Sequence, residues 1–121
     1  MTRPPKATAD HFKPPASVAR NASRGLKLRE VFGRGGTDVG RRRAEQLARR
    51  ELLAADDIMD IVGYFARHVV DKQAKGHAWG DLNDPSAGFI AWLLWGGDEG
   101  QAWAGRIKAR LDAIEEERKV D

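Results

Sequence analysis

Apolar residues recur at helical spacing along most of the chain, and glycine or proline separates one run from the next. The clearest run is Ile58, Ile61, Val62, Phe65 and Val69, at positions i, i+3, i+4, i+7 and i+11. An α-helix with 3.6 residues per turn places these five side chains on one face. No segment shows convincing strand alternation, so the spacing predicts an all-α fold.

Turn and capping residues divide the chain into about five short helices. Pro15 suits the first position of a helix that Gly33 ends. The next three helices are predicted to begin at Thr37, at Asp56 or Asp57, and at the pair Asp84-Pro85. Asp98 with Gln101 resembles a capping box for the last helix. The expected helices therefore cover roughly residues 15–32, 38–53, 57–71 and 85–95, with a final helix from Asp98.

Residues 1–15 differ in composition from the rest, because they contain four of the five prolines. Proline lacks an amide hydrogen and restricts the residue before it to extended backbone. The sequence therefore predicts an extended basic arm over residues 1–15, a compact helical bundle over residues 16–117 and a solvated tail over residues 118–121. Arg3, Lys6 and Lys13 are the arm residues expected to contact a partner.

The net charge of +3 conceals a strong asymmetry between the two halves of the chain. Residues 1–50 hold 13 Lys and Arg against 4 Asp and Glu, whereas residues 51–121 hold 8 against 14. The formal charges are therefore +9 and −6. Such an asymmetry indicates that the N-terminal half meets a polyanion or an acidic partner surface.

Arginines concentrate in and before the second predicted helix. Guanidinium groups bind phosphate through paired hydrogen bonds, and the amides of a glycine turn at a helix N-terminus favour anions. The alternative is a solvated basic surface, or ion pairing with the acidic half of the same molecule or of a neighbour. The candidate contact residues for a polyanion or partner are Arg34, Gly35, Gly36, Arg41, Arg42, Arg43, Arg49 and Arg50.

Several classes of function find no support in the sequence. The chain has no cysteine, and its three histidines share no metal-ligand spacing, so we expect no metal site. Gly35 and Gly40 have the spacing of a P-loop, but Arg41 and Arg42 follow instead of Lys-Ser/Thr. No nucleophile and base can be paired by spacing, so we expect a non-enzymatic protein without a cofactor.

The longest apolar run, residues 89–95, is far shorter than the roughly 20 residues that cross a membrane. No apolar stretch follows the charged first residues, so no secretory signal is expected. The chain also has four tryptophans, for which core packing is the ordinary role. A domain of this size can hardly bury all four, so Trp79, Trp92 and Trp95 are candidates for contact with a partner.

Five stretches resemble an uncharacterised helical module of tailed-phage and prophage proteins, which occurs alone or attached to head proteins. The resemblance covers residues 15–110, and its last motif is the most distinctive. The residues before 15 lie outside it, and the helix after Thr37 carries more arginine than the group. The resembling stretches are PASVARNA from Pro15, RGLKLR from Arg24, GRGGTDVG from Gly33, YFARHVVDK from Tyr64 and DPSAGFIAWLLWGGD from Asp84.

The resemblance implies a bacteriophage origin and no catalytic residue. We therefore expect a virion-associated structural or interaction protein, such as a minor capsid or decoration component, present in the host cytoplasm during assembly. Its partners would be phage structural proteins or further copies of itself. No contact with a membrane is expected. The alternative is a DNA-binding accessory protein that contacts nucleic acid without sequence preference.

Overall fold

The computed structural model describes residues 11–73 and 77–120 of the chain. Within them the only strand-like pairing is a single bridge between Phe12 and Leu53, and the rest of the regular structure is helical. The predicted all-α fold with about five helices is therefore confirmed. The elements are α2 (Ala16–Phe32), α3 (Asp38–Ala48), α4 (Ala55–His68), the 3₁₀ helix η1 (Val69–Gln73), α5 (Ala87–Leu94) and α6 (Gly97–Val120).

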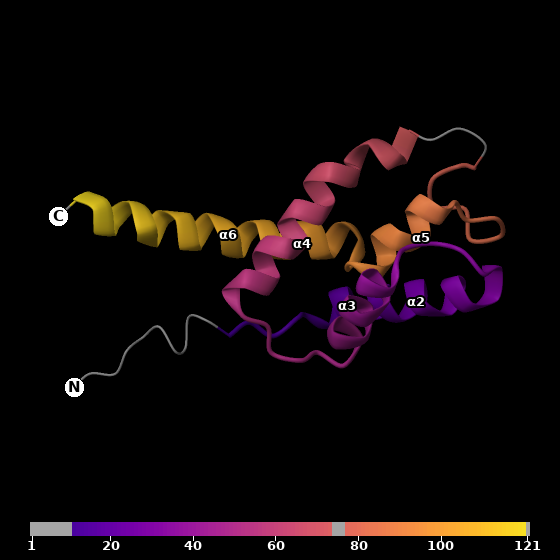
Figure 1. The fold of residues 1–121 in the computed structure, drawn as a ribbon, viewed down its shortest axis with the longest axis horizontal. Coiled ribbons are helices and arrows are strands. Elements are labelled where there is room, and N and C mark those ends of the chain that lie inside the picture. Colours follow the sequence, from indigo (N-terminus) through magenta and orange to yellow (C-terminus); the bar gives the residue numbers. More distant parts are fainter. Residues whose placement is uncertain (1–10, 74–76, 121) are drawn as a thin grey trace.

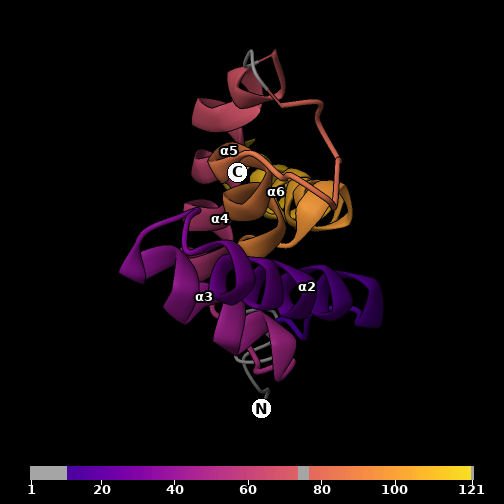
Figure 2. The same cartoon turned by 90° about the vertical axis from the view of Figure 1, so that its right-hand side faces the viewer.

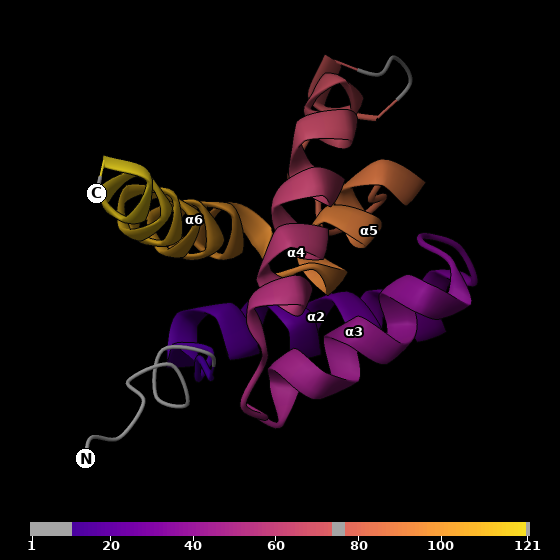
Figure 3. The ribbon, with the colours of Figure 1, turned by 60° about the vertical axis from the view of Figure 1, so that its left-hand side comes forward.

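The helices form a compact body from which one helix projects. Helices α2 and α3 lie side by side as an antiparallel pair, as Figure 2 shows. Helix α4 stands across this pair, and α5 fits between α4 and α2 (Figure 3). Helix α6 packs against α4 with its first half only, and its second half extends away from the other helices (Figure 1).

Helix α5 forms the centre of the core. Ile90, Trp92 and Leu94 are each at most 1 % exposed, and Trp95 just after the helix is 8 % exposed. Helix α2 can approach α5 closely because Gly25 has no side chain. A Cβ atom at this position would lie only 2.8 Å from the backbone nitrogen of Leu94. Small residues on α2 therefore allow the most apolar helix to be covered.

Asp98 ties the start of α6 to the rest of the core. Its Oδ1 atom accepts hydrogen bonds from Trp92 Nε1 at 2.8 Å and from Lys72 Nζ at 3.0 Å. Burial opposes ionisation of Asp98, but these hydrogen bonds and the charge of Lys72 outweigh it and hold the pKa of the carboxyl below its usual value. Asp98 therefore anchors tertiary contacts, and the predicted capping box with Gln101 is wrong, since α6 already begins at Gly97.

The second helix is shorter than predicted. We expected it to reach residue 53, but α3 ends at Ala48 and Arg50 adopts left-handed backbone with φ 54°. Arg50 Nε donates to the carbonyl of Pro14 at 2.8 Å, and Phe12 and Leu53 exchange backbone hydrogen bonds of 2.7 and 2.8 Å. These contacts hold residues 12–15 in extended form against the end of α3. The predicted arm is thus extended where it is described, and residues 1–10 with Arg3 and Lys6 lie outside the described residues.

The other helix boundaries shift by a few residues. Helix α4 begins at Ala55, where the Asp57 carboxylate accepts from the Ala54 amide at 3.0 Å, and the α-helix gives way to η1 after His68. Ser86, rather than Asp84, caps α5 and accepts from the Phe89 amide at 3.0 Å. Helix α6 continues to Val120, so residues 118–120 are helical and not a separate tail.

The contact between α2 and α5 generates a stability prediction. We expect Gly25→Ala to lower the free energy of unfolding by about 1–3 kcal/mol, because the added methyl group overpacks a rigid backbone contact. As a matched control, Gly105→Ala on α6 meets no atom within 4 Å. It should raise the free energy of unfolding by about 0.5–1 kcal/mol, since alanine favours helix. Urea denaturation followed by circular dichroism measures both, and equal effects would contradict the packing argument.

Candidate interaction surfaces

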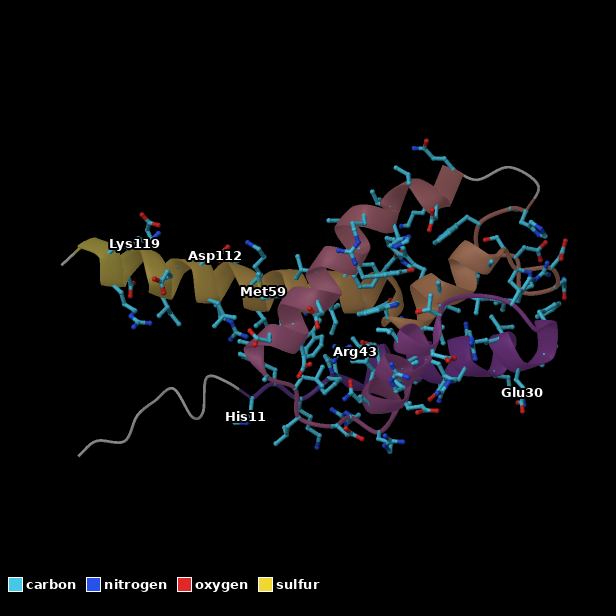
Figure 4. All side chains as sticks on the ribbon, in the orientation of Figure 1. His11, Glu30, Arg43, Met59, Asp112 and Lys119 are labelled. Carbon is cyan, nitrogen blue, oxygen red and sulfur yellow. The ribbon has the colours of Figure 1, made fainter. Side chains whose placement is uncertain are left out.

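Most of the predicted arginine cluster is engaged within the molecule. Arg43 forms ion pairs with Asp57 at 3.1 Å and Asp60 at 3.3 Å, and its side chain is only 10 % exposed. Its guanidinium also lies over the Trp95 ring, 5.7 Å from the centroid. Figure 4 shows Arg43 in the interior, between α3 and α4. Arg43 therefore joins two helices and is not available to an external polyanion.

Three further arginines of the predicted cluster form ion pairs at the surface, where their side chains are 35–63 % exposed. Arg34 meets Asp84 at 2.9 Å and Arg41 meets Glu45 at 2.8 Å, while Arg49 meets Glu51 at 2.7 Å. Arg42 is exposed and forms no ion pair within the described part of the chain. Arg34 thus reaches an acidic residue of the second half, whereas Arg41 and Arg49 pair with residues close in sequence, and contact of the cluster with a polyanion or partner stays a prediction.

Gly35 and Gly36, the predicted anion site, pack closely against α5. Gly35 has φ 103°, and a Cβ atom there would lie 2.5 Å from Ile90. Its carbonyl accepts a hydrogen bond of 2.9 Å from Arg29 Nε. Asp38 occupies the first turn of α3, and its carboxylate would repel an anion at this helix end. The glycines therefore let the loop pass close to α5. With Arg29 and Arg34 they also line a hollow of about 320 Å³, so the anion site stays a prediction.

Sequence inspection overlooked a basic stripe on α2. Arg20, Arg24 and Lys27 are all exposed and lie at positions i, i+4 and i+7, which share one helix face. This face is opposite to the buried residues Val18 and Ala22. None of the three cations forms an ion pair within residues 11–73 and 77–120, and α2 has no acidic residue before Glu30. Their spacing was the signal, but the denser arginines of α3 obscured it.

Two of the tryptophans expected at an interface lie in the core instead. Trp92 is 1 % exposed and Trp95 8 % exposed, so neither ring is available to a partner in this conformation. The expectation was wrong for these two because α5 is enclosed by α2, α4 and α6. Trp79 is partly buried, with its ring edge-on to those of Phe89 and Trp92 at 5.2 and 5.6 Å.

A groove of about 720 Å³ runs between α3, α4 and the start of α5. Its long wall follows α4, from Met59 through Gly63 and Arg67 to Asp71 in η1. Small residues of α5 form much of the opposite side, namely Ala87, Gly88 and Ala91. Because these side chains are so short, the space beside α4 stays unfilled. Val39 and Met59 at its edges are 55 % and 41 % exposed.

Tyr64 lies at the base of the groove between two rings. It stacks on Trp95 with centroids 4.7 Å apart and on His68 at 4.5 Å. Its hydroxyl is buried and has no hydrogen-bond partner among the described residues. Burial, with a smaller contribution from the negative charge of Asp71, raises the pKa of the Tyr64 phenol well above its usual value. His68 Nδ1 lies 3.1 Å from Asp71, which orients the imidazole.

Neither a metal-binding cluster nor a membrane-spanning helix is found among the described residues. No group of three or more His, Asp or Glu side chains in this part of the chain could hold a metal ion. None of its helices is both long and apolar enough to cross a bilayer. Comparison with protein-family models, curated proteins and solved structures found no match. The resemblance to a phage module therefore stays a prediction.

The unpartnered hydroxyl of Tyr64 generates a second stability prediction. Tyr64→Phe keeps the ring stack and removes a buried polar group, so we expect the free energy of unfolding at neutral pH to rise by about 1 kcal/mol. Above pH ~10 the unfolded phenol ionises while the folded phenol stays neutral, so stability present at neutral pH is lost as the pH rises. This loss should be absent in Tyr64→Phe. Parallel denaturation curves of both proteins from neutral to alkaline pH test it, and the same alkaline decline in both would contradict it.

Proposed function

We propose that the chain is a non-enzymatic interaction protein of a bacteriophage particle, which docks on an acidic protein surface through the outer face of α2. The observation that supports the docking face is the set of three exposed cations, Arg20, Arg24 and Lys27, without an ion-pair partner in the described chain. The phage context comes from the sequence resemblance. The arginines of α3 take little part, since most of them already neutralise acidic residues nearby.

A charged surface of this kind mainly orients the two partners and raises their association rate. Exposed charges attract an oppositely charged partner over about one Debye length, and salt screens the attraction. The stripe spans two turns of α2, or about 10 Å, which suits a small acidic patch. Three cations are few for strong binding to DNA, where each phosphate contact adds to the salt dependence. An acidic protein is therefore the favoured partner, with sequence-tolerant DNA binding as the alternative.

The test removes the three charges together. We expect Arg20→Gln/Arg24→Gln/Lys27→Gln to reduce co-purification of the chain with particles from the cells that encode it by at least tenfold. The matched control Arg34→Gln/Arg41→Gln/Arg49→Gln also removes three positive charges, but from side chains paired within the molecule. Quantitative mass spectrometry of the particles measures both. Equal retention of the two variants would rule out the α2 face as the docking surface.

A salt titration with mixed-sequence double-stranded DNA distinguishes the alternative. If DNA is the partner, the unmodified chain binds at low salt, and the α2 variant lowers the slope of log affinity against log salt by about three. If an acidic protein is the partner, DNA binding at moderate salt is absent and the variant changes only the association with particles.

A further inference from the structure

The end of α6 and the groove beside α4 are both unpartnered, and they complement each other. We propose that the chain self-associates head to tail, with the projecting end of α6 of one copy seated in the groove of the next. This inference goes beyond the docking role proposed above. It uses neither Arg20, Arg24 nor Lys27, so the two proposals can fail independently.

The projecting end of α6 is the segment that would insert into the groove of the next copy. Every residue from Asp112 to Lys119 is exposed, over a length of about 12 Å, and Figure 4 shows both of these side chains on the part of α6 that leaves the body. The apolar stripe of α6 reaches this part with Ile114, and Arg118 takes the next position on the same face. Ile107 is buried against the body, Leu111 is half-buried and Ile114 is 46 % exposed. A helix owes most of its stability to packing of its apolar face, and here that face runs on past its own support.

The groove would receive this helix end, and its dimensions suit a helix. The α4 and η1 residues that line it extend from Met59 to Asp71, which corresponds to about 18 Å along the axis. Ala87 and Ala91 present short side chains to the groove, whereas the end of Arg67 lies over Gly63 and Asp71 lies over Gly88. Exposed apolar side chains, Val39 and Met59, stand at its edges. Recognition of an amphipathic helix in such a groove is a common mode of binding.

The two surfaces offer one pair of opposite charges, although Asp60 and Asp71 also line the groove. Glu115 and Glu117 flank the apolar stripe of α6, and Glu117 forms no ion pair within the described residues. Arg67 lines the groove, is exposed and likewise lacks an ion-pair partner in this part of the chain. With Leu111 and Ile114 against Val39 and Met59, the glutamates can meet Arg67. The seated helix would thus bury apolar surface and pair two unpaired charges.

A second copy is required because the chain cannot fill its own groove. No residue of α6 lines the groove, and α6 packs against α4 and projects away from the body. The helix end and the groove lie on different surfaces of the chain, so the contact is heterologous. Each added copy presents a new free end and a new free groove, which produces rings or open chains rather than a closed two-fold dimer.

Mixing two defective variants tests this arrangement. Gly63→Leu fills the groove, and the only atom within 4 Å of its Cβ is the flexible end of Arg67. Ile114→Asp disables the projecting end. We expect the unmodified chain to increase in mass with concentration and each variant alone to remain monomeric. An equimolar mixture should form a one-to-one complex, because one partner keeps its end and the other its groove. Sedimentation velocity of the full chain measures all four samples.

Two controls keep the result interpretable. Leu82→Asp introduces the same charge at a leucine that is 47 % exposed, close to the 46 % of Ile114, and should leave self-association unchanged. Met59→Glu is a second groove variant at an exposed position, for use if circular dichroism shows that Gly63→Leu alters the fold. A monomeric unmodified chain, or a mixture that stays monomeric, overturns the proposal. Variants that still self-associate alone would also overturn it.

Discussion

Enclosure of α5 is the constraint on which the rest of the structure depends. This helix is apolar around its whole circumference, so it depends on other elements to cover it, and of its residues Ala87, Gly88 and Ala91 line the open groove. Helix α2 does so at very short distance through Ala22 and Gly25, and α4 contributes Phe65, whose ring meets Trp92 edge-on at 4.6 Å. The glycines around α5, including Gly35 and Gly96, follow from the same requirement. They allow loops to pass where a side chain would collide with the core.

Ion pairs between the two halves of the chain neutralise part of the charge asymmetry of the sequence. The chain folds back so that basic residues of the first half meet acidic residues of the second, as Arg43 does with Asp57 and Asp60 and Arg34 with Asp84. Such pairs help to set how α3 lies against α4. Among the exposed cations without an ion pair in the described residues, Arg20, Arg24 and Lys27 stand together on one face of α2.

Local signals predicted the helices well, and long-range contacts account for the errors. The stripe from Ile58 to Phe65 and the breaks at Gly33 and Gly96 are readable from neighbouring residues. The end of α3 at Ala48 is not, because it depends on Arg50 reaching Pro14 and on Leu53 pairing with Phe12, about 40 positions away. The residues of the candidate contact site were harder to predict than the helix boundaries. Composition indicated arginines, but only tertiary contacts show which arginines are already paired.

The sequence alone determined the all-helical class, the number of helices and the apolar character of α5, since these follow from periodicity and from turn residues within each segment. Only the tertiary structure decided that Trp92 and Trp95 are core residues, that Asp98 anchors α6 and that the cations of α2 stay unpaired. It also left a groove beside α4 and a projecting end on α6. These features depend on which surfaces meet in space, and the spacing of residues along one helix does not specify its neighbours.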